Sequence, residues 1–186
     1  VVGASGAGKS SVVFAGLLPK LRPNAEWLIA EFRPGPRPFE ALAAALLPFL
    51  EPAMSETDRL LEMRKLSGAL KSEELVLGEI IQTILRKQGD ARQLLLFADQ
   101  FEELYTLCDD AETRRAFVDT LLGGMSDLKL LLTLRADFMG QALSHRPFAD
   151  ALQDKVLNLG PMNAEELMQV IVEPAKKHHI GFEKGL

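Results

Sequence analysis

The chain has 186 residues, and its 47% hydrophobic and 25% charged composition is that of a globular domain, which excludes a disordered or fibrous protein. The 21 lysine and arginine residues against 26 aspartate and glutamate residues give a net charge of −5, which argues against a dedicated nucleic-acid binder. The single cysteine excludes an internal disulfide framework, and the apolar runs are too short for a transmembrane helix. We therefore expect a cytoplasmic protein with no direct nucleic-acid or membrane partner.

Short apolar runs alternate with amphipathic segments along the chain, the order that is typical of α/β proteins. The runs 94–98 and 130–132 are continuously apolar, as strands are when helices cover both of their faces, and this favours a central parallel sheet. In chain order, we predict strands at 1–2, 27–32, 94–98, 129–134 and 156–159. The first strand starts with the first residue and 181–186 carry no helix stop signal, so we expect a fragment truncated at both ends.

Helices are predicted between these strands. The first begins at Gly8-Lys9-Ser10 and ends near Leu21, with prolines at its end. About sixty residues separate the second and third strands, which is too many for one crossover helix, so we predict a helical insertion at about 39–88. The predicted helices and their caps are 39–49; 60–70, capped by Ser55 or Thr57; one capped by Ser72 and reaching Lys87; 112–122, capped by Asp109 with Glu112; and one after Asn163, with Glu166.

The most specific motif of the sequence lies directly after the first strand. Residues 3–10 match G-x-x-x-x-G-K-[ST] in full, as Gly3-Ala4-Ser5-Gly6-Ala7-Gly8-Lys9-Ser10. In such a loop backbone N–H groups point at phosphate oxygens, glycines permit the bend, and the helix N-terminus favours the anion. Lys9 would reach the β- and γ-phosphates, and the Ser10 hydroxyl would bind Mg²⁺. The alternative is a chance glycine-rich turn. The predicted nucleotide-binding residues are Gly3, Ser5, Gly6, Ala7, Gly8, Lys9, Ser10, Ser11 and Asp99.

Asp99 ends the buried run 94–98, where P-loop NTPases carry a carboxylate that positions Mg²⁺. It can accept a hydrogen bond from a Mg²⁺-bound water or from Ser10, so we predict these two residues as the metal site. Glu102 and Glu103 lie within one turn of Asp99, and each is a candidate to polarise the attacking water. Spacing does not choose between them. The alternatives are a strand-end acid or helix cap for Asp99 and a first-turn helix acid for either glutamate.

Arg135 follows the fourth predicted strand. At the carboxyl edge of a parallel sheet such a residue faces the ligand crevice, so we predict that Arg135 senses or stabilises the γ-phosphate. The alternative is a salt bridge from Arg135 to Asp137 or Asp99.

Together, these motifs resemble the nucleotide-binding core of STAND NTPases, the signal-transduction ATPases related to NACHT and NB-ARC proteins. The resemblance is closest to a bacterial clade often fused to WD repeats or other sensor domains. The residues that carry it span nearly all of the chain: 3–10, 11–19, Arg33-Pro34-Gly35, Asp99-Gln100-Phe101-Glu102-Glu103-Leu104, Leu134-Arg135-Ala136-Asp137-Phe138, Pro161-Met162 and Glu166-Leu167.

The resemblance implies a P-loop NTPase fold of three α/β/α layers around a parallel sheet with strand order 5-1-4-3-2. It implies a nucleotide-binding core at 1–160 and the start of a C-terminal helical lid at 161–186. It also assigns Asp99 to Mg²⁺, the glutamate pair to water activation and Arg135 to the sensor-1 position.

The ligands that the resemblance implies are ATP or ADP with Mg²⁺. ADP would hold a closed inactive form, and ATP would permit opening and self-oligomerisation of a full-length protein that carries sensor and effector domains. We expect the chain to be the ATP-binding, slowly hydrolysing core of a larger signalling or defence regulator. The alternatives are a nucleotide-binding module without turnover, an oligomeric ATPase of the AAA+ group and a small-molecule kinase.

Overall fold

Within the residues that the structure describes, the strands run parallel and form two three-stranded sheets. The computed structural model describes residues 1–124 and 128–182. One sheet has the order β5-β1-β6, and the other has the order β2-β3-β4; the pairings in this part of the chain are parallel. The strands are β1 (Val2–Gly3), β2 (Trp27–Phe32), β3 (Gln93–Ala98), β4 (Leu128–Leu132), β5 (Leu134–Arg135) and β6 (Asn158–Leu159).

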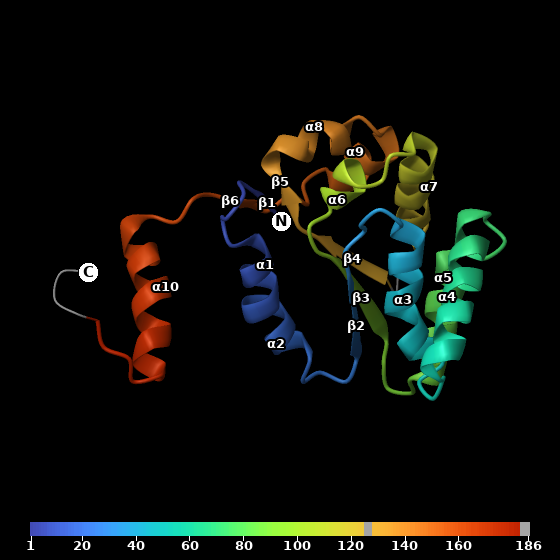
Figure 1. Ribbon diagram of the computed structural model, residues 1–186, viewed down its shortest axis with the longest axis horizontal. Helices are drawn as coiled ribbons and strands as arrows, with labels where there is room; N and C mark the ends of the chain where they lie inside the picture. The colour runs from blue at the N-terminus through green and yellow to red at the C-terminus, as the bar shows by residue number, and fades with distance from the viewer. Residues whose placement is uncertain (125–127, 183–186) are drawn as a thin grey trace.

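The strand order 5-1-4-3-2 in a single sheet is not confirmed, because strand pairing changes sheet at Thr133. The predicted strand 129–134 is divided there: β4 pairs with β3 as far as Leu132, and β5 pairs with β1 from Leu134 onward. Between them, the Thr133 N–H donates to the Ala98 carbonyl at 3.1 Å. One segment of chain therefore runs from the second sheet into the first (Figure 1).

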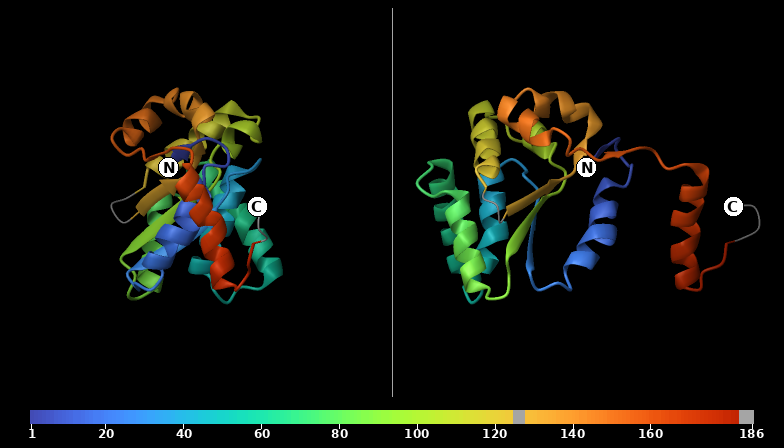
Figure 2. Two further views of the ribbon diagram at one scale, coloured as in Figure 1. Left: turned by 90° about the vertical axis from the view of Figure 1, so that its left-hand side faces the viewer. Right: turned by 180° about the vertical axis from the view of Figure 1, so that it is seen from behind.

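Helices cover β3 on both faces, as its uninterrupted apolar sequence predicts. Leu94, Leu96 and Ala98 belong to the larger core cluster, whereas Leu95 and Phe97 pack in a second cluster with residues of the helical segment after the first strand. Figures 1 and 2 show that segment on one side of β2, β3 and β4. The other side carries α3 (Pro38–Leu50), α4 (Glu56–Lys71), α5 (Leu77–Lys87) and α7 (Ala111–Leu122).

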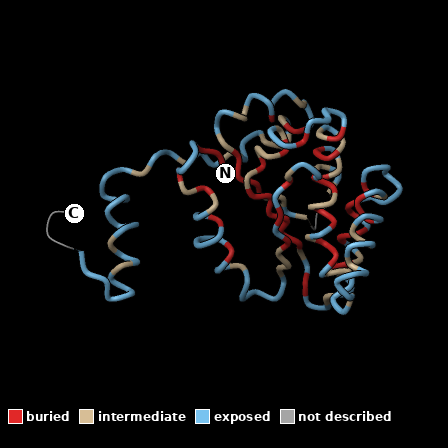
Figure 3. The backbone as a smooth tube through the Cα atoms, in the orientation of Figure 1, coloured by how far each residue is buried: buried red, intermediate tan, exposed pale blue. Residues whose placement is uncertain are grey.

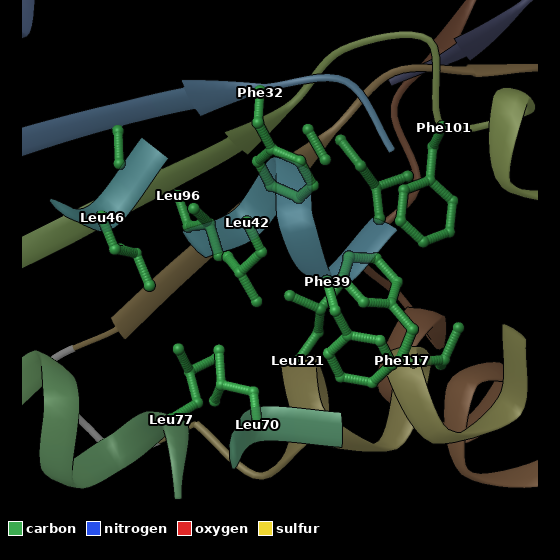
Figure 4. Close-up of a cluster of buried hydrophobic side chains, with 14 of the residues drawn as sticks. Phe32, Phe39, Leu42, Leu46, Leu70, Leu77, Leu96, Phe101, Phe117 and Leu121 are labelled. Atoms are coloured by element: carbon green, nitrogen blue, oxygen red, sulfur yellow. The ribbon is translucent and has the colours of Figure 1, made fainter. Parts of the chain in front are cut away.

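The larger core is built from side chains of the insertion helices, α7 and the second sheet (Figure 4). Phe117 on α7 makes edge-to-face contacts with Phe39 on α3, at 5.3 Å between ring centroids, and with Phe32 on β2, at 6.2 Å. Aromatic pairs prefer this geometry because the positive ring edge meets the negative ring face. Through these rings α3 and α7 pack together on the second sheet.

The helical segment after the first strand contains a wide turn that the sequence did not indicate. It consists of α1 (Lys9–Ser11), the π-helix η1 (Val12–Leu17) and α2 (Leu18–Leu21). Val13 and Leu18 are both buried, although residues five apart in an α-helix point about 140° away from each other. The hydrogen bonds of a π-turn run from i to i+5, and this wider turn brings both side chains onto β3. Pro19 lies inside α2, and the helix ends two residues later.

Two predicted helix starts are wrong. Ser72 does not begin α5; it ends α4, and its N–H donates to the Gly68 carbonyl at 2.9 Å. The residue before α5 is Val76. At α7, the cap is Asp110 rather than Asp109, and its side chain accepts the Glu112 N–H at 3.1 Å. At α7 two adjacent aspartates were equally suitable on sequence alone, whereas at α5 the apolar cap makes no side-chain hydrogen bond and so leaves no capping signal in the sequence.

Two other predicted caps are confirmed. The Ser55 hydroxyl accepts the Asp58 N–H at the start of α4. Asn163 and Glu166 form a reciprocal capping box at the start of α10 (Ala164–Lys177), with both hydrogen bonds at 2.9 Å. This box satisfies two of the N–H groups that a helix start leaves unpaired.

After β3, the chain contains several short helices and one separate longer helix in addition to α7 and the last three strands. The short elements are α6 (Glu103–Thr106), the 3₁₀-helix η2 (Ala136–Phe138), α8 (Met139–Leu143) and α9 (Arg146–Leu152). Figures 1 and 2 show α10 standing apart from the rest of the protein. The structure describes α10 in full, and none of its residues is buried (Figure 3). No helix in the described ranges has the length and hydrophobicity to cross a membrane.

Candidate functional site

The backbone conformation and packing of the loop between β1 and α1 depend on three glycines. Gly6 and Gly8 have φ angles of 77° and 84°, in the left-handed region that residues with a side chain rarely adopt. Gly3 is required for another reason: a Cβ atom there would lie 2.6 Å from the Leu159 carbonyl oxygen on β6. Two glycines therefore turn the loop, and the third permits the close approach of β6.

The Lys9 ammonium group lies inside this loop. Its side chain is almost fully buried, and Nζ donates hydrogen bonds to the Ala4 carbonyl at 2.8 Å and to the Gly3 carbonyl at 3.1 Å. A buried ammonium requires such acceptors. The loop thus concentrates positive charge where the following helix also presents its N-terminus, and both favour an anion. Of the other predicted residues, Ser5, Gly6 and Ser11 are exposed, and Ala7 is buried.

Asp99 is the centre of the hydrogen-bonded network at the end of β3. Its exposed fraction is 2%, and its Oδ1 accepts the Ser10 hydroxyl at 2.6 Å and the Thr133 hydroxyl at 2.8 Å. Its Oδ2 accepts a guanidinium N–H of Arg33 at 3.1 Å. The structure therefore brings together Ser10 and Asp99, which are 89 positions apart in the sequence, at the edge of the glycine-rich loop.

Thr133 connects Asp99 to the residue that follows it. Its side chain is completely buried, and Oγ1 also accepts the Gln100 N–H at 2.9 Å. Gln100 itself has a φ of 52°, which is uncommon for a residue other than glycine. Backbone strain of this kind persists only where the surroundings fix it, and here the Thr133 hydroxyl holds the strained turn next to the Asp99 carboxylate.

The two candidate glutamates occupy different positions. Glu102 Oε2 accepts the backbone N–H of Arg135 at 3.3 Å, so this carboxylate reaches the end of β5. Glu103 is the first residue of α6. Both side chains are half-buried. The structure thus joins Glu102 to the carboxyl edge of the first sheet, which spacing alone could not indicate.

The Arg135 guanidinium is held by its neighbours in sequence. It forms a bidentate salt bridge with Asp137, at 2.6 and 3.1 Å, and lies over the Phe138 ring, 5.2 Å from its centroid. This is the alternative arrangement that the sequence allowed.

Tyr105 packs against Phe138, the ring that Arg135 also contacts. Its ring stacks on Phe138 and meets Phe101 edge-on. Burial raises the pKa of the Tyr105 phenol to about 12, partly opposed by the nearby positive charge of Arg114. Tyr105 therefore anchors α6 to the aromatic rings beside it.

The residues at this edge fit a magnesium ion and phosphates. Mg²⁺ prefers oxygen donors and is usually held by one or two protein groups together with substrate phosphates. The Ser10 hydroxyl and the Asp99 carboxylate are donors of this type, 2.6 Å apart. In the part of the chain that the structure describes, no group of three or more His, Cys, Asp or Glu residues is arranged to hold a metal, so this pair would depend on phosphate oxygens to complete coordination.

Two residues of this network, Arg33 and Thr133, were not predicted from the sequence. Arg33 was recognised only as part of an Arg-Pro-Gly motif without a chemical role, although it pairs with Asp99 across 66 positions. Thr133 was given no role of its own within the predicted strand 129–134, although its hydroxyl contacts two residues of the site. A polar residue that interrupts an otherwise apolar strand was the available signal for Thr133. For Arg33, the signal was a cation directly after a strand whose parallel neighbour ends in Asp99.

The parallel α/β fold, the glycine-rich loop after the first strand and the buried carboxylate directly after the third place this chain in the class of P-loop NTPases. A family model described as Novel STAND NTPase 1 matches residues 1–186. The chain belongs to this family of bacterial STAND NTPases, and the resemblance noted from its motifs is confirmed. No curated protein matches the sequence.

Proposed function

We propose that this chain binds ATP or ADP with Mg²⁺ and hydrolyses ATP slowly, as the nucleotide-binding core of a larger signalling or defence regulator. The observation that carries the proposal is the hydrogen bond between Ser10 and Asp99 beside a glycine-rich loop that already holds Lys9. Membership of a STAND NTPase family supports the use of a nucleoside triphosphate.

Each residue of the site has a proposed role in binding. The N–H groups of the loop and the Lys9 ammonium would bind the phosphates, with Ser5, Ala7 and Ser11 at the loop and helix start. Ser10 and Asp99 would hold Mg²⁺, which supplies neutralisation of phosphate charge. Asp99 is ready for this role because Thr133 fixes the orientation of its carboxylate.

For hydrolysis, we propose Glu102 rather than Glu103 as the group that orients the attacking water. The Glu102 carboxylate reaches the Arg135 N–H at the carboxyl edge of β5, where ligands bind in parallel sheets. Arg135 would then contact the γ-phosphate after it leaves Asp137, at the cost of one half-exposed ion pair.

The nucleotide state would control conformation and oligomerisation in the full-length, cytoplasmic protein, together with sensor and effector domains. Within that protein we propose residues 1–160 as the core and 161–186 as the start of the helical lid. In the core, the two sheets would act as one sheet with the five predicted strands in the order 5-1-4-3-2, where β4 and β5 together form the predicted fourth strand and β6 is the fifth. The separation of α10 from the core supports this division. A switch of this kind requires nucleotide contacts that differ between two arrangements.

The test of the proposed function is titration of a fluorescent ATP analogue in the presence of Mg²⁺. We expect saturable binding that ATP displaces better than GTP and that the Lys9→Ala variant loses. Lys20→Ala is the matched control, because Lys20 is an exposed lysine on α2. Absence of binding by wild-type protein with a cooperative thermal melt would refute the proposal for this chain.

A nucleotide-binding module without turnover is the second candidate, favoured by the Arg135–Asp137 salt bridge, which occupies the guanidinium needed for the γ-phosphate. Glu102→Gln and Glu103→Gln separate the two functions. Loss of phosphate release in the first variant alone supports hydrolysis with Glu102. The same background rate in wild type and both variants supports the module.

A further inference from the structure

The two oxygens of the Asp99 carboxylate have different kinds of partner. Oδ1 accepts two neutral hydroxyl groups, those of Ser10 and Thr133, whereas Oδ2 pairs with the Arg33 guanidinium at 3.1 Å. Arg33 is the first residue after β2, and the function proposed above gives it no role. Hydroxyl groups satisfy hydrogen bonding but carry no charge, so it is Arg33 that balances the charge of Asp99 here.

Burial in this pair is unequal. The Asp99 side chain is 3% exposed and the Arg33 side chain is 54% exposed. A buried carboxylate without a partner is costly, whereas an exposed arginine loses little when it leaves a partner and returns to water. The pair is therefore built so that the carboxylate always needs a cation, but Arg33 can be exchanged for another one.

We propose that Arg33 is a tethered counter-ion for Asp99, which neutralises the carboxylate in the absence of Mg²⁺ and gives up Oδ2 when the metal binds. This inference rests on the proposed function, since it places the Mg²⁺ site at Asp99. Without the metal, Arg33 screens the phosphates of a bound nucleotide from the Asp99 charge. With the metal, that screening no longer depends on Arg33, so Arg33 acts as a positioning residue that determines how strongly nucleotide binding depends on Mg²⁺.

Nucleotide binding by the 186-residue chain, measured in EDTA and in saturating Mg²⁺, tests this role. Arg33→Ala should weaken binding of the fluorescent ATP analogue about fivefold in EDTA, the effect of losing one partly exposed ion pair. It should leave binding in Mg²⁺ within about twofold of wild type, since the metal then neutralises Asp99. Arg33→Lys should restore most of the affinity in EDTA, because it keeps the charge.

The matched control is Arg37→Ala. Arg37 lies on the same connection between β2 and α3, but it pairs with Glu40 and its side chain is 71% exposed. This variant should bind as wild type does in both buffers. An equal loss for Arg33→Ala in EDTA and in Mg²⁺ would mean direct contact with the nucleotide and would overturn the proposal. No loss in either buffer would overturn it as well.

Thermal unfolding without nucleotide separates this proposal from the proposed function. Arg33→Ala should lower the midpoint in EDTA by about 2–4 °C, and Mg²⁺ should restore it. In an Asp99→Asn background the same substitution should have no effect, because the charge to be balanced is gone. If wild-type protein binds no nucleotide, the proposed function fails, but the melts still decide the role of Arg33: an unchanged midpoint in EDTA overturns it.

Discussion

Replacement of Thr133 by valine would keep the shape of the side chain and remove only its hydroxyl. That hydroxyl donates to the Asp99 carboxylate at 2.8 Å and accepts the Gln100 N–H at 2.9 Å, in a position with no solvent access. A hydrogen bond to a charged group contributes about 1.5–3 kcal/mol, and a neutral one about 0.5–1.5 kcal/mol. Because Asp99 keeps Ser10 and Arg33, we expect the free energy of unfolding to fall by about 2–4 kcal/mol.

Urea denaturation at neutral pH measures this loss. The matched control is Thr120→Val on α7, because the Thr120 hydroxyl donates only within its own helix, to the Ala116 carbonyl at 2.9 Å. That variant should change the free energy of unfolding by about 0.5 kcal/mol or less, since such bonds within a helix stabilise little. If the two variants differ by less than about 1 kcal/mol, Thr133 does not bind the Asp99 network as described, and the reasoning fails.

Three further predictions concern single groups. Gly8→Ala should lower the free energy of unfolding by about 1–2 kcal/mol, because the backbone φ at this position is 84°. Gly16→Ala is the control: it lies inside η1, where an added Cβ atom meets open space, and should not lower the free energy of unfolding. Paired urea titrations compare the two variants. Tyr105 is the single tyrosine, so ultraviolet absorbance should show its phenol titrating near pH 12 in folded protein and near its ordinary value in urea. Because the pKa is raised in the folded state, the stability that the neutral phenol contributes is present below pH 10 and is lost as the pH rises through 12. Titration near pH 10 in folded protein would contradict the burial of Tyr105. Hydrogen bonds from Thr113 and Glu112 lower the pKa of the Asp110 carboxyl below its ordinary 3.8. Asp110 therefore contributes stability that is present above pH 3.8 and is lost as the pH falls through the lowered pKa. Asp110→Asn should flatten this part of the dependence of unfolding free energy on pH, and an unchanged dependence in acid would contradict the role of Asp110 as the cap of α7.

The sequence predicted the parts of the fold that depend on neighbouring residues. The P-loop pattern, the buried run of β3 and the capping box at Asn163 are local, and the structure contains the corresponding elements. The π-turn of η1 was not predictable in this way, because it depends on which side chains meet β3. The division of the predicted fourth strand between two sheets likewise depends on its partners on either side.

The candidate site was predicted less completely than the fold. Local pattern selects Lys9 and Ser10, which belong to the P-loop motif at the start of α1, and Asp99, which directly follows β3. It cannot show that Arg33 reaches Asp99, since that contact depends on the register between β2 and β3, in which Phe32 lies opposite Ala98. Nor can it choose between Glu102 and Glu103, because the choice depends on where β5 ends relative to α6.

The short pairing of β1 with β6 has a mechanical consequence. The two strands share a ladder of only two residues, and a carbonyl of β6 lies against Gly3, the first residue of the glycine-rich loop. Only four residues separate the end of β6 from the start of α10. A pulling force on α10 would therefore be transmitted to the glycine-rich loop before it reached the larger core, and the β1–β6 ladder would be the first pairing to yield. In a force-extension experiment with handles at the two ends of the chain, this rupture should precede the opening of the β2-β3-β4 sheet.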